Sequence, residues 1–177
     1  MTVIEPTDLT IRKADEGDVV LLSVLASTTF YEAYFEQDES HNLAAYIYRS
    51  FEPEHLRTEF DDPSSTFFIA EVNGRAVGYA RLIAGSTAES VTGDAIIELK
   101  RFYVLERLWK AGVGRQLLEH CLRYSRQNGF DTLWLGVWEE NIRAQRFYSK
   151  FGFRQVGTLL FPYGDVEGTN LVLQTDL

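Results

Sequence analysis

Two glycines, Gly112 and Gly114, stand in a short segment that also carries Lys110 and Arg115. Glycine has no Cβ atom, so a ligand can approach the backbone amides closely at these two positions. The apolar residues that follow recur at helical spacing, which predicts that the segment leads into a helix. Unpaired N–H groups at a helix start attract anions, and the two basic side chains would add full positive charge. The segment indicates a site for an anionic group.

Taken alone, the glycine pair is equally consistent with a tight turn. Its spacing differs from the G-x-x-x-x-G-K-[ST] loop of nucleotide hydrolases, and the G-x-G-x-x-G pattern of dinucleotide-binding proteins is absent. The sequence therefore disfavours both of those nucleotide sites.

A second set of polar and aromatic residues begins at Asn141 and ends at Tyr148. The two residues are seven positions apart, about two helical turns, so both side chains fall on one face of a helix. A tyrosine phenol at such a position can donate a proton to a leaving group. Each residue also has a plain structural interpretation, because asparagine is a common helix N-cap and tyrosine is a common core residue.

In the first half of the chain we expect a helical region and a β-hairpin, which would help to position these segments. A first strand is expected over 9–13, and Asp15 can cap the helix that follows it. Two further helices are expected over 41–51 and 53–60. Strands at 67–72 and 76–82 flank Asn73-Gly74, a pair that accepts the positive φ angles of a type I′ turn. A polar loop, 85–93, then leads to a long strand over 95–105.

The second half alternates strand and helix. A helix is expected over 112–127 with Gly129 at its end, then a strand over 132–138 and a helix over 141–151. Strands at 153–160 and 169–175 would form a final hairpin. Strands joined by a helix of this length are expected to be parallel, with a right-handed crossover. The predicted fold is an α/β domain over 1–177 whose mixed sheet is antiparallel at first, parallel in the centre and closed by a hairpin.

Composition narrows the class of protein further. The chain has 177 residues, a net charge of −9 and one cysteine, so it lacks the basic face that nonspecific nucleic-acid binding needs and cannot form an internal disulfide. No run of 18 apolar residues predicts a membrane span, and the first eight residues do not resemble a secretory signal. We expect a cytoplasmic protein with a small-molecule substrate, and the acidic balance suits a cationic one.

The order strand, glycine loop, helix, strand, followed by N-x-x-A-x-x-F-Y-x-x-F-G-F over 141–153, resembles the GCN5-related N-acetyltransferase (GNAT) superfamily. The resemblance covers residues 95–153, and the preceding hairpin and helices fit the same topology. It implies a mixed, largely antiparallel sheet with flanking helices and two parallel central strands that splay apart. It also implies acetyl-coenzyme A as cosubstrate, with no metal.

The resemblance assigns roles to individual residues. The backbone of the strand end would pair with the pantetheine arm, the glycine-loop amides would hold the diphosphate, Asn141 would contact the cofactor arm and Tyr148 would lie beside the thioester sulfur. The implied cofactor-binding residues are Phe102, Tyr103, Val104, Lys110, Ala111, Gly112, Val113, Gly114, Arg115, Asn141 and Tyr148. One position departs from the pattern, since Trp109 stands where the family usually has glutamine or arginine. An indole donates one hydrogen bond and supplies no charge, which puts cofactor affinity in question.

Acetyl transfer to an amine needs a neutral nucleophile, a polarised carbonyl and a proton for the departing thiolate. We hypothesise that a backbone N–H near Tyr103 or Val104 polarises the carbonyl and that the Tyr148 phenol protonates the sulfur. Glu98 stands six residues before Val104, on the same face of the strand, and could accept the amine proton through water. An ordinary strand carboxylate is the alternative interpretation of Glu98, and Lys100 shares its face.

For the acceptor, three features resemble the bacterial spermidine/spermine N-acetyltransferase branch: Thr28-Thr29-Phe30-Tyr31-Glu32, Trp134-Leu135-Gly136-Val137-Trp138-Glu139, and Gly164-Asp165 followed by Thr169. The resemblance implies a polyamine acceptor. Carboxylates of Glu32, Glu36, Asp38 and Glu39 would attract such a cation, and Tyr31 and Tyr34 would add cation–π contacts. An acidic helix end and a core aromatic pair are the simpler interpretations of the same residues.

Other acceptors stay open, namely a peptide or protein amine or another small metabolite. A non-catalytic acetyl-coenzyme A sensor is the alternative from another class, which Trp109 favours and Tyr148 opposes. His41, His55 and His120 read as surface or helix residues without a catalytic context. The C-terminal hairpin, with Phe161 and Tyr163, could pair across a homodimer.

Overall fold

The structure is a computed structural model that describes residues 8–163 and 166–177, with side chains described outside residues 162–167. Gly164-Asp165, one feature of the polyamine resemblance, lies outside the described residues, as does the side chain of Tyr163. The dimer prediction that used Tyr163 therefore stays a prediction. In chain order the elements are β1 Leu9–Lys13, η1 Glu16–Asp18, α1 Val19–Tyr34, α2 Ser40–Phe51, α3 Pro53–Asp61, β2 Ser65–Val72, β3 Arg75–Ala84, β4 Ile96–Val104, η2 Glu106–Leu108, α4 Val113–Gln127, β5 Thr132–Trp138, α5 Ile142–Ser149, β6 Arg154–Tyr163 and β7 Val166–Asp176.

The strands form a seven-stranded mixed sheet in the order β1-β2-β3-β4-β5-β7-β6. Compact packing divides the chain into two units, residues 1–81 with 101–121 and residues 82–100 with 122–177. The predicted class, a mixed sheet with flanking helices, is confirmed. The prediction of one domain over 1–177 stays a prediction.

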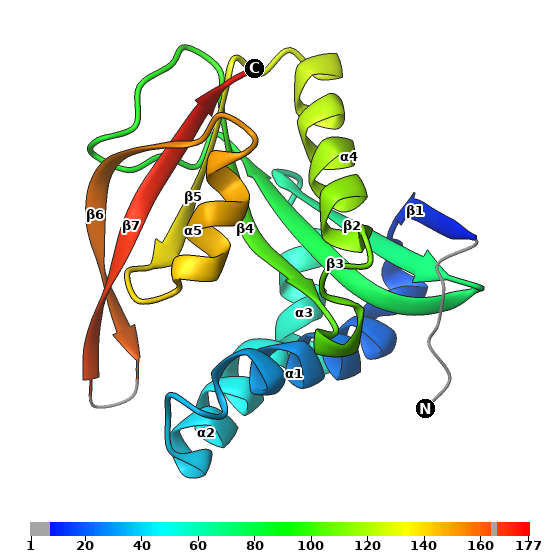
Figure 1. The fold of residues 1–177 in the computed structure, drawn as a ribbon. Coiled ribbons are helices and arrows are strands. Elements are labelled where there is room, and N and C mark those ends of the chain that lie inside the picture. Colours follow the sequence, from blue (N-terminus) through cyan, green and yellow to red (C-terminus); the bar gives the residue numbers. More distant parts are fainter. Residues whose placement is uncertain (1–7, 164–165) are drawn as a thin grey trace. The chain divides into compact units, whose positions relative to one another are not determined.

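In the first unit, three helices pack around one apolar core. Helix α1 contacts both α2 and α3, as Figure 1 shows for α1 and α2. The apolar residues Val19, Leu22 and Ala26 of α1, which recur at helical spacing, are all buried. Asp15 caps the η1 turn that leads into α1, where its Oδ1 accepts the Gly17 N–H at 2.8 Å. Asp15 therefore caps the helical segment as predicted, although the short 3-10 turn η1 lies between Asp15 and α1.

The hairpin β2–β3 has the predicted turn. Asn73 and Gly74 have φ angles of 52° and 71°, as a type I′ turn requires. Strand β1 extends the pairing, antiparallel to β2, with Leu9 opposite Val72 and Lys13 opposite Phe68.

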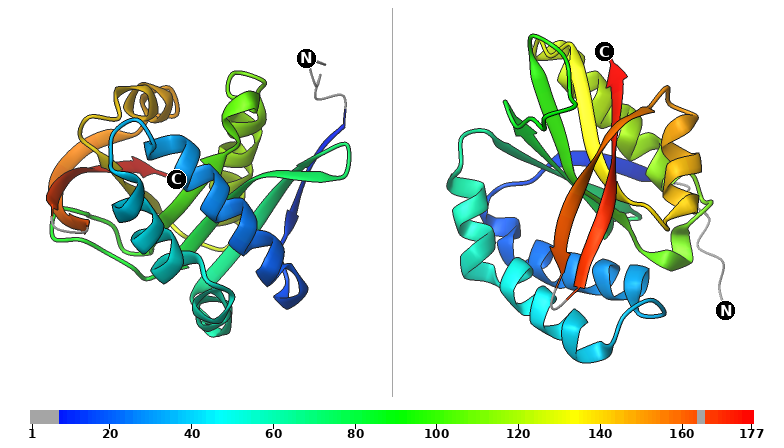
Figure 2. Two further views of the ribbon diagram at one scale, coloured as in Figure 1. Left: turned by 90° about the horizontal axis from the view of Figure 1, so that it is seen from below. Right: turned by 90° about the vertical axis from the view of Figure 1, so that its left-hand side faces the viewer.

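In the second unit, β4 and β5 are parallel, with Ile96 opposite Thr132 and Glu98 opposite Trp134, which confirms the predicted parallel centre. The final hairpin is also confirmed, and the right-hand view of Figure 2 shows β6 and β7 winding about each other. Its placement could not be predicted, because β7 lies between β5 and β6 and pairs antiparallel with β5 from Thr132 to Trp138.

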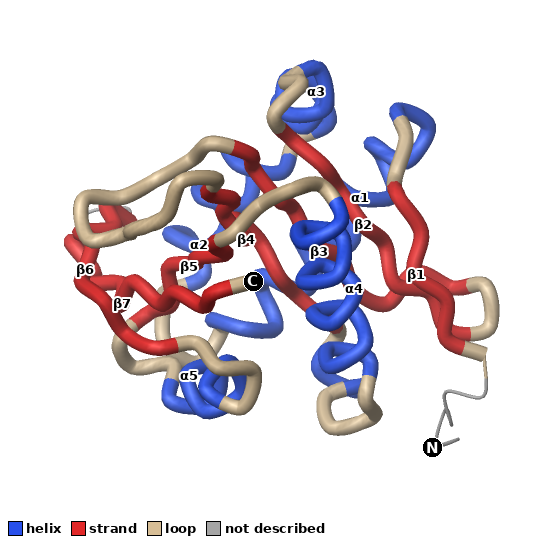
Figure 3. The backbone as a smooth tube through the Cα atoms, turned by 90° about the horizontal axis from the view of Figure 1, so that it is seen from above, coloured by secondary structure: helices blue, strands red, loops and turns tan. Residues whose placement is uncertain are grey.

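A long loop over 85–95 joins β3 to β4 and is drawn in tan in Figure 3. Val91 of this loop packs with Trp134 and Val172 in a small apolar cluster. The loop also approaches β6 closely, since a Cβ atom on Gly157 would collide with the side chain of Ser90. These contacts fix the loop against the sheet of the second unit.

Helix α4 ends as predicted at Gly129, whose φ is 81° and which closes the helix with a left-handed residue. No helix in the part of the chain that the structure describes is long and apolar enough to cross a membrane.

Candidate functional site

The glycine segment forms a left-handed loop at the start of α4. Lys110 and Gly112 have φ angles of 73° and 85°. Glycine tolerates this region, whereas a lysine there is uncommon and marks a backbone held in place by its surroundings. A Cβ atom on Gly112 would meet nothing within 4 Å, so the backbone conformation and not crowding requires glycine. The helix begins at Val113, one residue later than predicted.

The amides of this loop form a donor set suited to an anion. The first intrahelical bond runs from the Gln116 N–H to the Gly112 carbonyl at 3.1 Å. The N–H groups of Val113 and Gly114 precede it, in the first turn of the helix, where the helix itself offers no acceptor. They carry the partial positive charge of the helix start, and the open space over Gly112 gives a ligand room to approach. The residues present fit the diphosphate of a coenzyme.

Trp109, the residue that departs from the family pattern, braces this loop. Its indole Nε1 donates a hydrogen bond to the carbonyl of Val104 at 2.8 Å, which ties the loop to the end of β4. The side chain is half-buried. From the sequence, Trp109 could only be recognised as a side chain without charge and with one hydrogen-bond donor. Its contact with Val104 could not be predicted.

The end of β4 carries the residues expected beside the pantetheine arm. Phe102, Tyr103 and Val104 are all partly exposed. Strand β3 approaches them closely, because a Cβ atom on Gly78 would lie 2.8 Å from the Tyr103 carbonyl oxygen. The Tyr103 ring stacks on Tyr79 with centroids 5.9 Å apart. Burial, neighbouring tyrosines and a hydrogen bond with Tyr34 together raise the pKa of Tyr103 well above its ordinary value.

The three residues predicted to bind the acceptor lie on α1. Tyr31 is 43% exposed and stacks on Phe35, on the outer side of α1. The carboxylate of Glu32 accepts the Glu106 N–H at 2.8 Å and so has a structural partner. Tyr34 packs its ring 4.6 Å from that of Phe30.

A buried ion-pair network in the first unit was missed by the sequence analysis. Glu59 on α3 accepts hydrogen bonds from Arg81 on β3 at 2.6 Å and from Arg101 on β4 at 2.6 and 2.9 Å. His55 lies on helix α3, as a surface or helix residue was predicted to, and its ring nitrogen is 3.2 Å from the same carboxylate. The signal available was Arg81 within an apolar stretch of β3, which indicates a buried partner but does not identify it.

In the second unit, Glu98 is buried and already has polar partners. The Ser86 hydroxyl donates to its Oε2 at 2.5 Å, and Lys100 Nζ donates to its Oε1 at 3.1 Å. The Ser86 carbonyl also accepts the indole N–H of Trp134 at 2.8 Å. The loop over 85–95 therefore orients the carboxylate that the sequence analysis named as a candidate base.

Helix α5 positions Asn141 and Tyr148. Asn141 is the N-cap, and its Oδ1 accepts the Ala144 N–H at 3.0 Å, which leaves the amide nitrogen outside the capping interaction. Gln145 donates to the Glu139 carbonyl at 2.7 Å and stabilises the turn before the helix. Tyr148 is 7% exposed and packs against Phe147 and Phe153 at 5.3 and 5.5 Å. The structural interpretation of Asn141 is confirmed, and Tyr148 lies in a rigid aromatic setting.

Other reactive residues contribute no further centre. Among the described residues, no group of His, Cys, Asp and Glu side chains could hold a metal ion. Cys121 is fully buried, and burial raises the pKa of its thiol to about 12. His120 packs edge-on against Phe68 at 4.6 Å.

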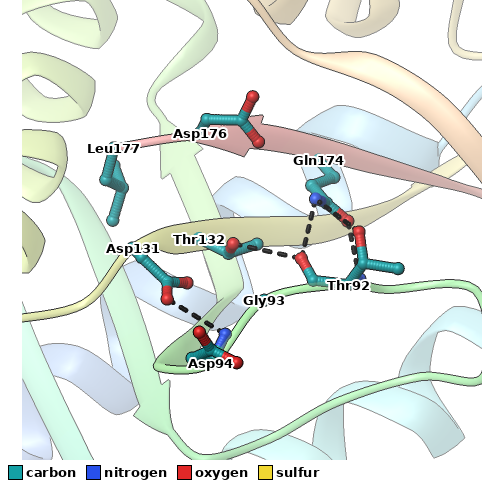
Figure 4. Close-up of a pocket in the computed structure, with 8 residues that line it drawn as sticks. All are labelled: Thr92, Gly93, Asp94, Asp131, Thr132, Gln174, Asp176 and Leu177. Atoms are coloured by element: carbon teal, nitrogen blue, oxygen red, sulfur yellow. Dashed lines mark hydrogen bonds between the residues drawn. The ribbon is translucent and has the colours of Figure 1, made fainter.

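One open pocket of about 470 Å³ lies in the second unit, at the ends of β5 and β7 (Figure 4). Its lining includes Asp94, Asp131 and Asp176, and Asp131 accepts the N–H groups of Asp94 and Ala95 at 3.0 Å. None of the predicted site residues lines it. The Asp131 carboxylate therefore stabilises the turn that precedes β4.

Comparison with known proteins agrees with the two motifs. The sequence model of the Acetyltransferase (GNAT) family matches residues 27–153. An uncharacterised N-acetyltransferase of Lactobacillus delbrueckii subsp. lactis is 26% identical over 97% of this chain and 99% of that protein. Another, from Mycobacterium bovis, is 30% identical over 88% of this chain and 96% of that protein. Among solved structures, the PaiA N-acetyltransferase of Thermoplasma acidophilum in complex with coenzyme A matches with a TM-score of 0.76 at 19% identity, over 97% of this chain and 100% of that one.

Proposed function

This chain belongs to the Acetyltransferase (GNAT) family and is an acetyl-coenzyme A-dependent N-acetyltransferase, and we propose on that premise that it transfers the acetyl group to a primary amine by direct attack of that amine. The observation that carries the proposal is the left-handed loop at Lys110 and Gly112 with its run of amide donors. Acetyl-coenzyme A supplies the activated thioester and the diphosphate that such a loop suits.

The first unit supplies the binding groups in this proposal. The amides from Lys110 to Arg115 hold the diphosphate, except that of Ala111, whose N–H donates to the Leu108 carbonyl at 3.1 Å. The backbone of Phe102, Tyr103 and Val104 pairs with the pantetheine arm, and an N–H near Tyr103 or Val104 polarises the acetyl carbonyl. The hydrogen bond from Trp109 to the Val104 carbonyl supports these roles, because it holds the strand end and the loop in one arrangement.

The second unit supplies the groups that move protons. The Tyr148 phenol gives its proton to the departing thiolate, and the rigid packing of its ring reduces the cost of orienting it. Glu98 accepts the proton of the amine through water, and the Ser86 hydroxyl orients its carboxylate. Asn141 contacts the cofactor arm through the amide nitrogen that its capping bond leaves available.

The acceptor in this proposal is a primary amine. A polyamine remains a prediction from the resemblance, and the surface carboxylates give it little support. Glu32 is bonded to the Glu106 amide, and Asp38 accepts the Glu39 N–H at 2.7 Å and the Asn42 side chain at 3.2 Å. Carboxylates that stabilise local turns have less capacity to capture a cation.

Two measurements test the proposal. Calorimetry with acetyl-coenzyme A should show binding that Gly112→Ala weakens, and thiol release should accompany at least one acceptor in a panel of polyamines, amino acids and peptides with free N-termini. Binding without turnover across the whole panel would favour a non-catalytic sensor. Absence of acetyl-coenzyme A binding by the folded protein would refute the proposed site itself.

A further inference from the structure

Helix α1 carries a continuous line of apolar side chains on its outer side, which we call the α1 stripe. Its four members are each between 43% and 62% exposed: Val20, Val24, Tyr31 and Phe35. Val20 and Tyr31 are eleven positions apart, which is about three helical turns. Val24 and Phe35 have the same spacing, so the stripe runs along the helix axis. Successive residues turn by about 100° around that axis, which places the stripe opposite the buried Leu22, Ala26 and Thr29.

The polar side chains beside the α1 stripe already have hydrogen-bond partners within the protein. The Thr28 hydroxyl donates to the Val24 carbonyl at 2.8 Å, and the Ser27 hydroxyl donates to the Ser23 carbonyl at 2.7 Å. Glu32 is the charged residue of α1, and its carboxylate accepts the Glu106 N–H at 2.8 Å. Because the hydroxyl donors are satisfied inside the helix, this side of α1 can be removed from water without leaving them unpaired.

The outer side of α4 shows what an ordinary solvent-facing helix of this protein carries. Its exposed positions are charged at Arg115, Glu119, Arg123 and Arg126. Arg115 and Glu119 also lie 3.6 Å apart as an ion pair along the helix. A surface helix normally has such a polar outer face, and an exposed apolar patch with a polar surround marks an interaction site. The α1 stripe therefore has the character of a contact surface.

The area of the α1 stripe suits the centre of a protein–protein interface. The exposed parts of its four side chains, with that of the neighbouring Leu21, amount to roughly 400 Å² per chain, whereas a standard interface buries about 800 Å² per partner. Interfaces have an apolar centre surrounded by a polar rim. The stripe supplies such a centre, and the polar residues around it supply the rim.

The order of residue sizes along the α1 stripe is complementary to itself. Two valines lie towards the start of the helix and two aromatic residues towards its end, with Ser27 and Thr28 midway between Val20 and Phe35. In an antiparallel pair of α1 helices centred on this midpoint, Val20 faces the partner's Phe35. Val24 then faces the partner's Tyr31. Small side chains opposite large ones fill space evenly, and small residues at the centre let two helices approach closely.

The charge of the chain favours the same arrangement. The net charge is −9, so two copies repel each other except where an uncharged surface lies between them. An acidic segment with Glu36, Asp38 and Glu39 follows α1. Parallel helices would bring the two acidic segments together. Antiparallel helices separate them by the length of the helix, about 20 Å, which exceeds the screening distance of about 8 Å at physiological salt.

We infer that two copies of this chain associate through the α1 stripe, with their α1 helices antiparallel about a two-fold axis next to Ser27 and Thr28. Such an interface is closed, because the same surface is used on both copies. It differs from the C-terminal hairpin that the sequence analysis considered for a homodimer. The inference concerns assembly and does not depend on the proposed acetyl transfer.

Sedimentation equilibrium over a range of concentrations tests the association with the parent protein, Val24→Asp and the control Leu160→Asp. Leu160 is 71% exposed on β6 in the C-terminal hairpin, so the control introduces the same charge at another exposed apolar residue. We expect a monomer–dimer equilibrium in the parent, weakened at least tenfold by Val24→Asp and unchanged by Leu160→Asp. Added salt should strengthen the association of the parent, because it screens the repulsion between two acidic chains. The thermal midpoint of monomeric Val24→Asp should stay near that of the parent, since Val24 is exposed.

Cross-linking with a short bismaleimide tests the antiparallel arrangement. Cys121 is fully buried and does not compete for the reagent. Thr28→Cys should form cross-linked dimers by itself, because the two copies of this position lie next to the axis. Val20→Cys should cross-link only when it is mixed with Phe35→Cys, since the two copies of Val20 lie at opposite ends of the contact, about 20 Å apart.

Several results would overturn the inference. A parent that stays monomeric at about 1 mM has no such interface. An association that Leu160→Asp disrupts and Val24→Asp does not would assign the contact to the C-terminal hairpin. Self-cross-linking of Val20→Cys would show parallel helices, and continued growth beyond a dimer would show an open assembly. Flotation of a monomeric parent with vesicles of phosphatidylcholine and phosphatidylglycerol, lost in Val24→Asp, would assign the stripe to a membrane surface.

Discussion

The indole of Trp109 donates to the carbonyl of Val104 across 2.8 Å, which fastens the glycine loop to the end of β4. The Trp109 side chain therefore braces the loop against the strand. Trp109→Phe should keep the ring packing and lose the hydrogen bond, which is worth about 1 kcal/mol. We expect KM for acetyl-coenzyme A to rise about fivefold with kcat little changed, as steady-state kinetics can measure. An unchanged KM would show that the brace does not serve the cofactor.

Gly112→Ala tests the left-handed loop and has a matched control. Alanine at a φ of 85° costs about 1–2 kcal/mol of backbone strain, although its Cβ would meet no neighbouring atom. Gly129 has a φ of 81° and equally open surroundings at the other end of α4. Both variants should lose similar free energy of unfolding, but calorimetry should show weaker acetyl-coenzyme A binding for Gly112→Ala alone. Equal loss of binding in both would attribute the effect to general destabilisation.

Tyr148→Phe should lower kcat about a hundredfold, since general acid catalysis typically contributes at least that factor. The ring keeps its packing against Phe147 and Phe153, so the free energy of unfolding and KM for acetyl-coenzyme A should change little. The measurement is kcat of the parent and of Tyr148→Phe at saturating acetyl-coenzyme A. Full turnover in the variant would remove the phenol from the mechanism.

Glu98→Gln should reduce kcat by about a hundredfold if its carboxylate receives the amine proton. Ser86→Ala should have a smaller effect in the same direction, because it removes the hydroxyl that orients Glu98 at 2.5 Å. An unchanged kcat in Glu98→Gln would leave Glu98 with its structural contacts to Ser86 and Lys100 alone.

Because of Cys121, the free energy of unfolding should decrease as the pH becomes alkaline. Burial raises the pKa of its thiol from 9.0 to about 12, so the folded state keeps the proton where the unfolded state releases it. The contribution to stability is complete below pH 9 and is lost as the pH rises from 9 towards 12. Denaturant titrations should show a steeper alkaline loss of unfolding free energy in the parent than in Cys121→Ala. At pH 8 a thiol reagent should label the parent only as it unfolds, and rapid labelling of the folded protein would contradict the burial.

The cofactor motifs and most secondary structure could be predicted because their determinants are local. Asn73-Gly74 determines a turn because both residues accept positive φ angles. Asn141 caps the helix that follows it by accepting the N–H of a residue three positions later. The parallel pairing of β4 and β5 follows from the length of the helix between them. The turn and the cap depend on residues that are neighbours in sequence, and the strand pairing depends on the single helix that joins the two strands.

Only the tertiary structure decided which distant residues meet. Period-two alternation indicates that a strand has two faces, but it does not say which helix covers each face. That is why the contacts of Glu59 with Arg81 and Arg101, which bridge 22 and 42 residues, could not be predicted, nor could the position of β7 between β5 and β6. Local conformational preference determines the elements, whereas burial of their apolar faces determines their partners.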